Sequence, residues 1–239
     1  MWALHGLPDS VDHCRRGGRA SGSCDVCRRK AVQGGSNGSS IGVWQNAYAP
    51  ALNYALSTTD MTHLLGGSAV WSLPVGKGKQ FVNRGGILDG IIGGWKLSSM
   101  LQYHTGLPFT PTIGTSNLSG ALSGTWLPNR LASGTLANPT IAKWFNVSAF
   151  AVPAPYTFGN SGRDILFGPH YADVDFSLAK SFKMPFHEGA SLLIRIDSSD
   201  VFNHPNFGQP GAGIGTSGAG IITNALNSRA VQLGAKLSF

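Results

Sequence analysis

The chain has 239 residues, of which 33 are glycine and only 12% are charged, about half of the roughly 25% usual for a soluble globular protein. No stretch approaches the roughly 18 to 20 apolar residues that a membrane helix needs, because the longest candidate, residues 87–97, is interrupted by Asp89 and three glycines. These values exclude a helical membrane protein and a charged coiled coil. The net charge of +7 is too dilute over most of the chain to predict nucleic acid as a partner.

The first 43 residues differ in composition from the rest. Residues 1–40 hold six of the 18 lysines and arginines and all three cysteines, and their apolar residues show no periodicity. We therefore predict a basic, cysteine-containing, disordered part at 1–43, separate from 44–239. No basic region followed by an apolar stretch comes after Met1, so no signal peptide is visible.

Four soft metal ligands lie close together in this first part: His13, Cys14, Cys24 and Cys27. The spacing of Cys24 and Cys27 suits one half of a zinc site. His13 and Cys14 are adjacent, however, which is awkward for two ligands of one tetrahedral ion, and no periodic apolar residues are available to pack beside such a site. We expect no metal here, and a zinc-binding nucleic-acid module remains a minor alternative.

Beyond this part, apolar and polar residues alternate with the period of two that is typical of β-strands. The pattern predicts antiparallel strands, joined in one curved open sheet, at 62–73, 94–105, 171–184, 190–202 and 229–239. The clearest is 171–184, where Lys180 is the one charged residue on the apolar face.

The connections between these strands have two very different lengths. Residues 185–189 form a short turn, whereas 106–170 is a long stretch rich in Gly, Pro, Asn, Ser and Thr. Alternation alone also fits a soluble β-sandwich. Short turns on one side, long loops on the other and aromatic residues near strand ends favour a membrane barrel.

Five stretches, in order, carry a resemblance to a known family. They are Tyr54–Leu73 with Gly76–Lys79 (GKGK), Gly93–Thr110 (GGWKLSSMLQYHTGLPFT), Trp144–Phe182 (WFNVSAF…GNSGRDILFGPH…SLAKSF), Phe202–Pro210 (FNHPNFGQP) and the last strand. Together they resemble the C-terminal end of TonB-dependent outer-membrane receptors of the Oar-like type, whose full members carry a carboxypeptidase-regulatory-like domain. The resemblance covers about four fifths of the chain, residues 44–239.

The resemblance implies an all-β chain that forms an antiparallel transmembrane β-barrel segment in the cell outer membrane. Its partners would be outer-membrane lipid and the barrel assembly machinery, with the TonB complex a partner only of an intact receptor that carries a plug. Phe239 would be the terminal aromatic that the assembly machinery reads. The other interpretation of Phe239 is a core residue at a strand end.

The predicted strands are too few for a closed barrel. Single-chain bacterial barrels need at least about eight strands, and lipid does not tolerate open sheet edges. With five or six strands, the sequence predicts a fragment of a receptor for the uptake or surface handling of an unidentified substrate, non-functional alone. The alternative is a soluble β-rich binding or adhesion module with a disordered basic N-terminus.

No catalytic set emerges, so we expect no enzyme, no catalytic residue and no cofactor. The seven histidines are scattered near predicted strand ends and turns. Asp173 and Asp175 share one strand face, where carboxylates can serve acid–base chemistry or bind a cation. In a barrel wall they are instead lumen-lining charges, with Lys183 or Arg195 as candidates for pairing. Gly211–Gly220 (GAGIGTSGAG) lacks the ending of a phosphate loop and is predicted as a flexible loop.

Overall fold

The computed structural model describes residues 13–16, 22–28, 32–34, 54–75, 87–113, 126–184 and 190–239. Of residues 13–34 and 87–89 it describes the backbone elements alone.

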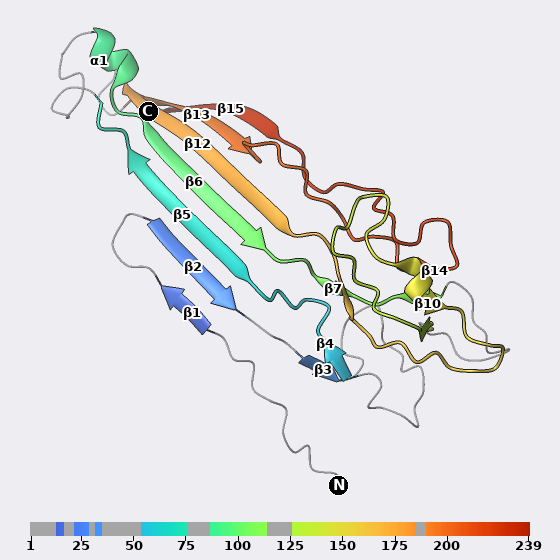
Figure 1. Ribbon diagram of the computed structural model, residues 1–239. Helices are drawn as coiled ribbons and strands as arrows, with labels where there is room; N and C mark the ends of the chain where they lie inside the picture. The colour runs from blue at the N-terminus through green and yellow to red at the C-terminus, as the bar shows by residue number, and fades with distance from the viewer. Residues whose placement is uncertain are drawn as a thin grey trace.

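The described chain is built around one open antiparallel sheet (Figure 1). Its seven strands follow the order β1 (His13–Arg16), β2 (Gly22–Arg28), β5 (Leu64–Ser72), β6 (Lys96–His104), β12 (Tyr171–Lys183), β13 (Ser191–Ser199) and β15 (Ala230–Ser238). Every neighbouring pair in this order is antiparallel. The last five strands fall on the five that the sequence predicts, each within a few residues of the predicted bounds. The prediction of an all-β, open antiparallel sheet is confirmed.

The N-terminal part contains strands that the sequence did not indicate. β1 and β2 extend the sheet beyond β5, and β3 (Val32–Gly34) pairs with β4 (Tyr54–Leu56). Sheet ladders are made by backbone N–H and C=O groups, which every sequence carries, so pairing of this kind does not require periodic apolar side chains. The division of the chain at residue 43 stays a prediction.

The connections between the long strands alternate between the two ends of the sheet. At one end, Met184 N–H donates to Ala190 C=O at 2.9 Å across the β12–β13 connection, and the predicted turn at 185–189 lies outside the described residues. The same end carries the helix α1 (Ile87–Ile92), between β5 and β6, and the C-terminus (Figure 1). At the other end lie the long connections 105–170 and 200–229. We call these the short-connection end and the long-loop end.

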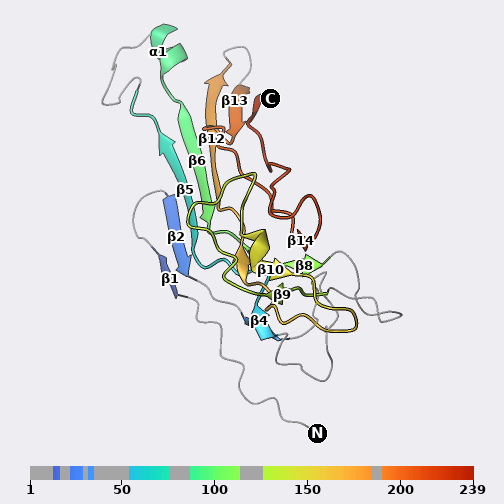
Figure 2. The ribbon, with the colours of Figure 1, turned by 45° about the vertical axis from the view of Figure 1, so that its right-hand side comes forward.

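The two long connections fold together into a compact unit, which we call the loop body (Figure 2). Its regular pieces are β7 (Pro108–Phe109) paired with β11 (Leu166–Phe167), β9 (Asn129–Arg130) paired with β10 (Phe150–Ala151), β8 (Thr112–Ile113) paired in parallel with β14 (Gly213–Ile214), and a 3₁₀ helix at Val147–Ala149. Its apolar core is Phe109, Ile113, Phe145, Ala149, Phe150, Leu166 and Ile214. The long connection is therefore not structureless.

The glycine-rich segment 211–220 belongs to this loop body. Gly211 N–H donates to Ile221 C=O at 2.9 Å, Gly220 N–H donates to Gly211 C=O at 2.8 Å, and Ile214 is buried in the core. The segment is a hydrogen-bonded turn, which differs from the flexible loop that its composition predicts. Gly211 serves close packing, since a Cβ at this position would collide with the carbonyl of Gly218.

Candidate functional site

One face of the sheet is apolar across all five long strands. The register aligns one row of cross-strand partners: Trp71, Leu97, Leu178, Ile196 and Leu233. A second row towards the short-connection end aligns Phe182, Leu192 and Leu237. Cross-strand partners project on the same side of a sheet, so the alternation read in each strand separately adds up to one continuous apolar surface.

This apolar surface is not covered by a second layer in the described part of the chain. Trp71 is 55% exposed and Leu233 is 79% exposed, and every residue of β15 is exposed. None of the buried apolar residues lies within β5, β6, β12, β13 or β15, since nearly all of them belong to the loop body. A soluble β-sandwich would bury such a face against another sheet, whereas a membrane barrel leaves it to lipid.

The opposite face is polar and hollowed. An open groove of about 440 Å³ crosses β6, β12, β13 and β15 on this side. Its polar lining comes from Ser98, Asp175, Ser177, Arg195, Asp197 and Gln232. Serine, charged and amide side chains that face one hollow are typical of a barrel's water-filled interior, so this groove is the candidate lumen surface.

The ion pair on the polar face is not the one that the sequence predicts. Arg195 Nε donates to Asp197 Oδ1 at 2.7 Å and to Ser177 Oγ at 3.0 Å. Arg195 and Asp197 are two residues apart on β13 and therefore share its face. In the register Arg195 lies opposite Ala179, four residues along β12 from Asp175, so the neighbour on its own strand is the nearer partner.

The two aspartates singled out from the sequence bind neutral partners instead. Asp173 Oδ2 accepts a hydrogen bond from the Tyr171 hydroxyl at 3.0 Å, and Asp175 Oδ1 accepts one from Asp200 N–H at 3.1 Å. Asp175 thus holds the backbone of the turn that follows β13. In the described ranges no three His, Cys, Asp or Glu side chains come close enough to hold a metal ion.

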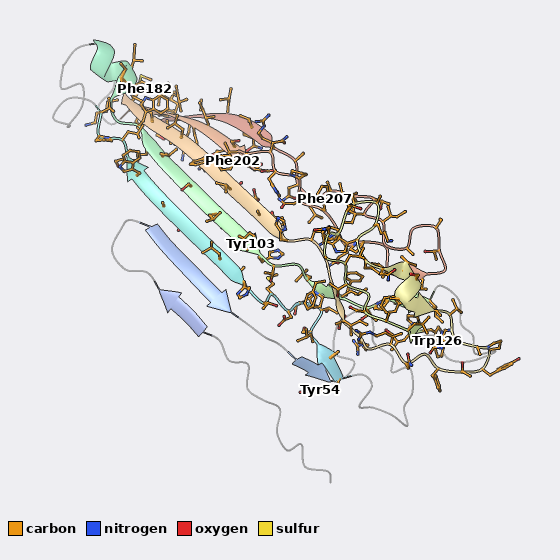
Figure 3. All side chains as sticks on the ribbon, viewed as in Figure 1. Tyr54, Tyr103, Trp126, Phe182, Phe202 and Phe207 are labelled. Atoms are coloured by element: carbon orange, nitrogen blue, oxygen red, sulfur yellow. The ribbon has the colours of Figure 1, made fainter. Side chains whose placement is uncertain are left out.

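A cluster of aromatic rings marks the long-loop end of the strands. The rings of His104 and Tyr171 stack at 5.2 Å with their planes 8° apart, and His170 lies 6.0 Å from Tyr103 and 5.9 Å from His204. Figure 3 places Tyr103 at this end of the sheet. The sequence predicts that these histidines lie near strand ends. It does not predict that their rings meet, because these contacts depend on the strand register and on the turn at 200–206. Tyr103 lies on the apolar face, in phase with Leu97, where an amphipathic ring at a strand end suits the membrane–water boundary.

The loop body is held by buried polar contacts as well as by its apolar core. The Thr110 hydroxyl donates to Asp164 Oδ1 at 2.8 Å, and Asp164 N–H donates back to Thr110 Oγ1 at 2.9 Å. Burial raises the pKa of Asp164 above its usual value, against the opposing effects of the Thr110 hydrogen bond and the Arg163 charge. Asp164 adopts a left-handed φ of 52°, which Asp tolerates better than most residues.

The remaining sequence predictions fall at the two ends of the chain. Phe239 follows β15 and is 94% exposed, on the face of Leu233 and Leu237. Its role as an assembly signal stays a prediction. The side chains of His13, Cys14, Cys24 and Cys27 lie outside the described residues, although β1 and β2 place Cys14 opposite Cys27.

Comparison with known proteins assigns the chain to a family. The sequence model of a family described as an outer membrane beta barrel domain matches residues 28–232. No curated protein and no solved structure matches the chain. Among the described residues, no helix is long and apolar enough to cross a membrane. Because the family match spans most of its length and the sheet carries an uncovered apolar face, this chain belongs to the family of outer-membrane β-barrel domains.

Proposed function

We propose that the chain is a wall segment from the C-terminal part of a TonB-dependent, Oar-like receptor barrel, which takes up or handles a substrate at the cell surface. In this proposal the wall lies in the outer membrane, with the apolar face on lipid and the polar groove on the lumen. The observation that carries the membrane placement is the uncovered apolar row from Trp71 to Leu233.

The receptor assignment draws on two further features. The five stretches described above, which resemble the Oar-like family, follow one another in the family's order. The long connections also gather at one end of the strands and pack into the loop body, as surface loops of a receptor would. Loops of this size on one side and short turns on the other are typical of outer-membrane barrels.

The wall contacts outer-membrane lipid and is inserted by the barrel assembly machinery, and the TonB complex acts only on an intact receptor with its plug. No cofactor, nucleic acid or catalytic step is part of this proposed role. The sheet of seven strands in the described chain is open, so a closed barrel needs further strands.

Two experiments test this proposal in turn. Cells that express an intact receptor carrying this segment are fractionated, and the outer-membrane fraction is washed with alkaline carbonate. Retention in the membrane supports the wall placement, and complete release would favour the soluble binding module. An intact receptor that carries this segment is then assayed for binding to the periplasmic domain of TonB, and absence of binding would remove the receptor assignment while leaving the barrel family in place.

A further inference from the structure

Lys180 is the one charged residue on the apolar face of β12. It lies between Leu178 and Phe182 on that face and is only 4% exposed. A lysine on the lipid side of a barrel is strongly destabilising at the membrane midplane and nearly neutral near the interface. A buried lysine on this face therefore needs both a partner and a place near the membrane surface.

The partner of Lys180 is the helix α1. The Lys180 ammonium donates a hydrogen bond to the carbonyl of Gly90 in α1. It also lies 4.8 Å from the centre of the Phe182 ring and 5.6 Å from that of Trp95, distances at which aromatic faces attract a cation. Figure 3 shows Phe182 beside α1, at the short-connection end of the sheet.

Trp95 makes a second contact between α1 and the sheet. Its indole Nε1–H donates to Ile91 C=O at 3.0 Å, and its own C=O accepts from Leu73 N–H at 3.0 Å, which continues the β5–β6 ladder. The helix is thus joined to β12 by Lys180 and to β6 by Trp95. Both residues project from the apolar face, so α1 lies on the lipid side of the wall.

The two isoleucines of α1 whose side chains are described are exposed. Ile91 is 59% exposed and Ile92 is 42% exposed. A helix of six residues is too short to cross a membrane. Its exposed isoleucines continue the apolar face that includes the exposed Trp71. Exposed isoleucines beside a tryptophan and a lysine stem suit the membrane–water interface, where Lys extends its charge towards the headgroups.

We propose that α1 is an interfacial anchor, which lies in the phospholipid headgroup region of the membrane leaflet at the short-connection end and is held there by Lys180. Ile91 and Ile92 enter the acyl boundary, and Lys180 is the positioning residue that holds the helix against the wall. Short turns of outer-membrane barrels face the periplasm, so the leaflet is the inner one. The inference depends on the membrane placement of the wall proposed above.

The test measures membrane contact at single positions in a full-length receptor that carries this chain as its C-terminal part. Cys14, Cys24 and Cys27 are replaced by serine, and one new cysteine that carries an environment-sensitive fluorophore is placed at Ile92, Leu233 or Gln232. The protein is reconstituted in phosphatidylcholine vesicles whose lipids bear a nitroxide quencher near the headgroup. Leu233 and Gln232 are neighbours on opposite faces of β15, so they form a matched pair for the two sides of the wall.

We expect quenching at Ile92 to be at least as strong as that at Leu233, because the quencher lies at headgroup level, and to exceed that at Gln232. Lys180→Met should lower quenching at Ile92 to the level of Gln232 while leaving Leu233 quenched, and Lys183→Gln, on the opposite face of β12, should change neither. If Leu233 is quenched no more than Gln232, the wall placement itself fails. If Leu233 is quenched and Ile92 is not, the anchor alone is refuted. Unchanged quenching at Ile92 in Lys180→Met would refute the positioning role of Lys180.

Discussion

The side chain of Asn206 binds both backbone polar groups of Ala172. Ala172 N–H donates to Asn206 Oδ1, and Asn206 Nδ2 donates to Ala172 C=O, each at 2.8 Å. β13 pairs with β12 only from Phe176 onwards, so Ala172 lies on a length of β12 whose outer edge has no strand beside it. Asn206 takes the place that the next residue of a strand would occupy, and it ties the turn after β13 to the wall.

Removing this amide should loosen the turn. Asn206 is 1% exposed, and Asn206→Ala leaves the N–H and C=O of Ala172 without their partner. Buried polar groups left unpaired cost about 1–3 kcal/mol, so we expect a lower urea midpoint in detergent micelles and faster amide exchange at Ala172.

The variant Asn206→Asp tests the two hydrogen bonds of Asn206 separately. Aspartate keeps the acceptor for Ala172 N–H but sets a carboxylate against Ala172 C=O, which raises the pKa of the new carboxyl in the folded state. A raised pKa gives stability that is lost as pH rises through it. We therefore expect the Asp variant to be less stable than wild type at pH 7 and to approach it in acid. A pH-independent deficit would contradict the donor role of Nδ2.

The sequence could predict the strands but not how the long connections between them pack. Alternation in 171–184 and 229–239 is local, so the five wall strands were readable and both faces of the sheet followed from them. The core of the loop body joins Phe109, Phe145 and Ile214, which lie far apart in a chain without periodicity, and only the folded structure brings them together.

The polar contacts could not be predicted from the sequence either. The FNHPNFG segment carries part of the family resemblance, but its hydrogen bond to Ala172 depends on where β13 stops pairing. The sequence offers Arg195 as one of two candidate partners for Asp173 and Asp175, whereas it pairs with Asp197, because a sequence gives the face of a residue but not its position along the neighbouring strand. Lys180 stood out as an exception, but α1, its partner, had no periodic signal of its own.

Asp164 should make the loop body less stable at neutral pH than it is in acid. Burial raises the pKa of this carboxyl above 3.8. Its stabilising contribution is therefore complete below the unfolded pKa and is lost as pH rises through the folded one. Asp164→Asn keeps an acceptor for the Thr110 hydroxyl and tolerates the positive φ.

We expect Asp164→Asn to have a higher urea midpoint than wild type at pH 7, with the difference shrinking as pH falls towards the ordinary pKa of 3.8. Thr110→Val serves as the contrast, because it removes the partner of both hydrogen bonds and should lower stability at either pH. An Asn variant less stable than wild type at pH 7 would mean that the attraction of Arg163 outweighs burial.

Gly106 should not tolerate a side chain. A Cβ at this position would overlap the carbonyl of Gly168, and Gly168 N–H is tied to Leu107 C=O at 2.9 Å, so the backbone has little room to move. Overpacking of this kind costs about 1–3 kcal/mol, and we expect Gly106→Ala to speed proteolysis within 106–170. Gly66→Ala is the matched control, because nothing lies within 4 Å of a Cβ there. Equal proteolysis of the two variants would contradict the close approach.

Deletion of Phe239 distinguishes a packing role of this residue from its recognition by the assembly machinery. The residue is 94% exposed, so the described sheet draws little stability from it, although burial of a phenylalanine in lipid contributes roughly 1.5 to 3 kcal/mol. If the assembly machinery reads this residue, its deletion in a full-length receptor with this C-terminus should cut outer-membrane insertion in cells sharply. Refolding of the purified barrel into detergent should weaken only mildly, because no machinery acts there.

Leu237→Ala is the control for this deletion, since it removes apolar area from the same face of β15 and leaves the terminal aromatic in place. We expect it to affect both assays to a similar, small extent. Insertion is measured as the heat-modifiable barrel in the outer-membrane fraction, and refolding as the band shift of purified protein. If deletion of Phe239 impairs both assays equally, the residue acts through packing. If it impairs neither, the assembly-signal role is wrong. The evidence that this chain belongs in the outer membrane is then its uncovered apolar face and its family alone.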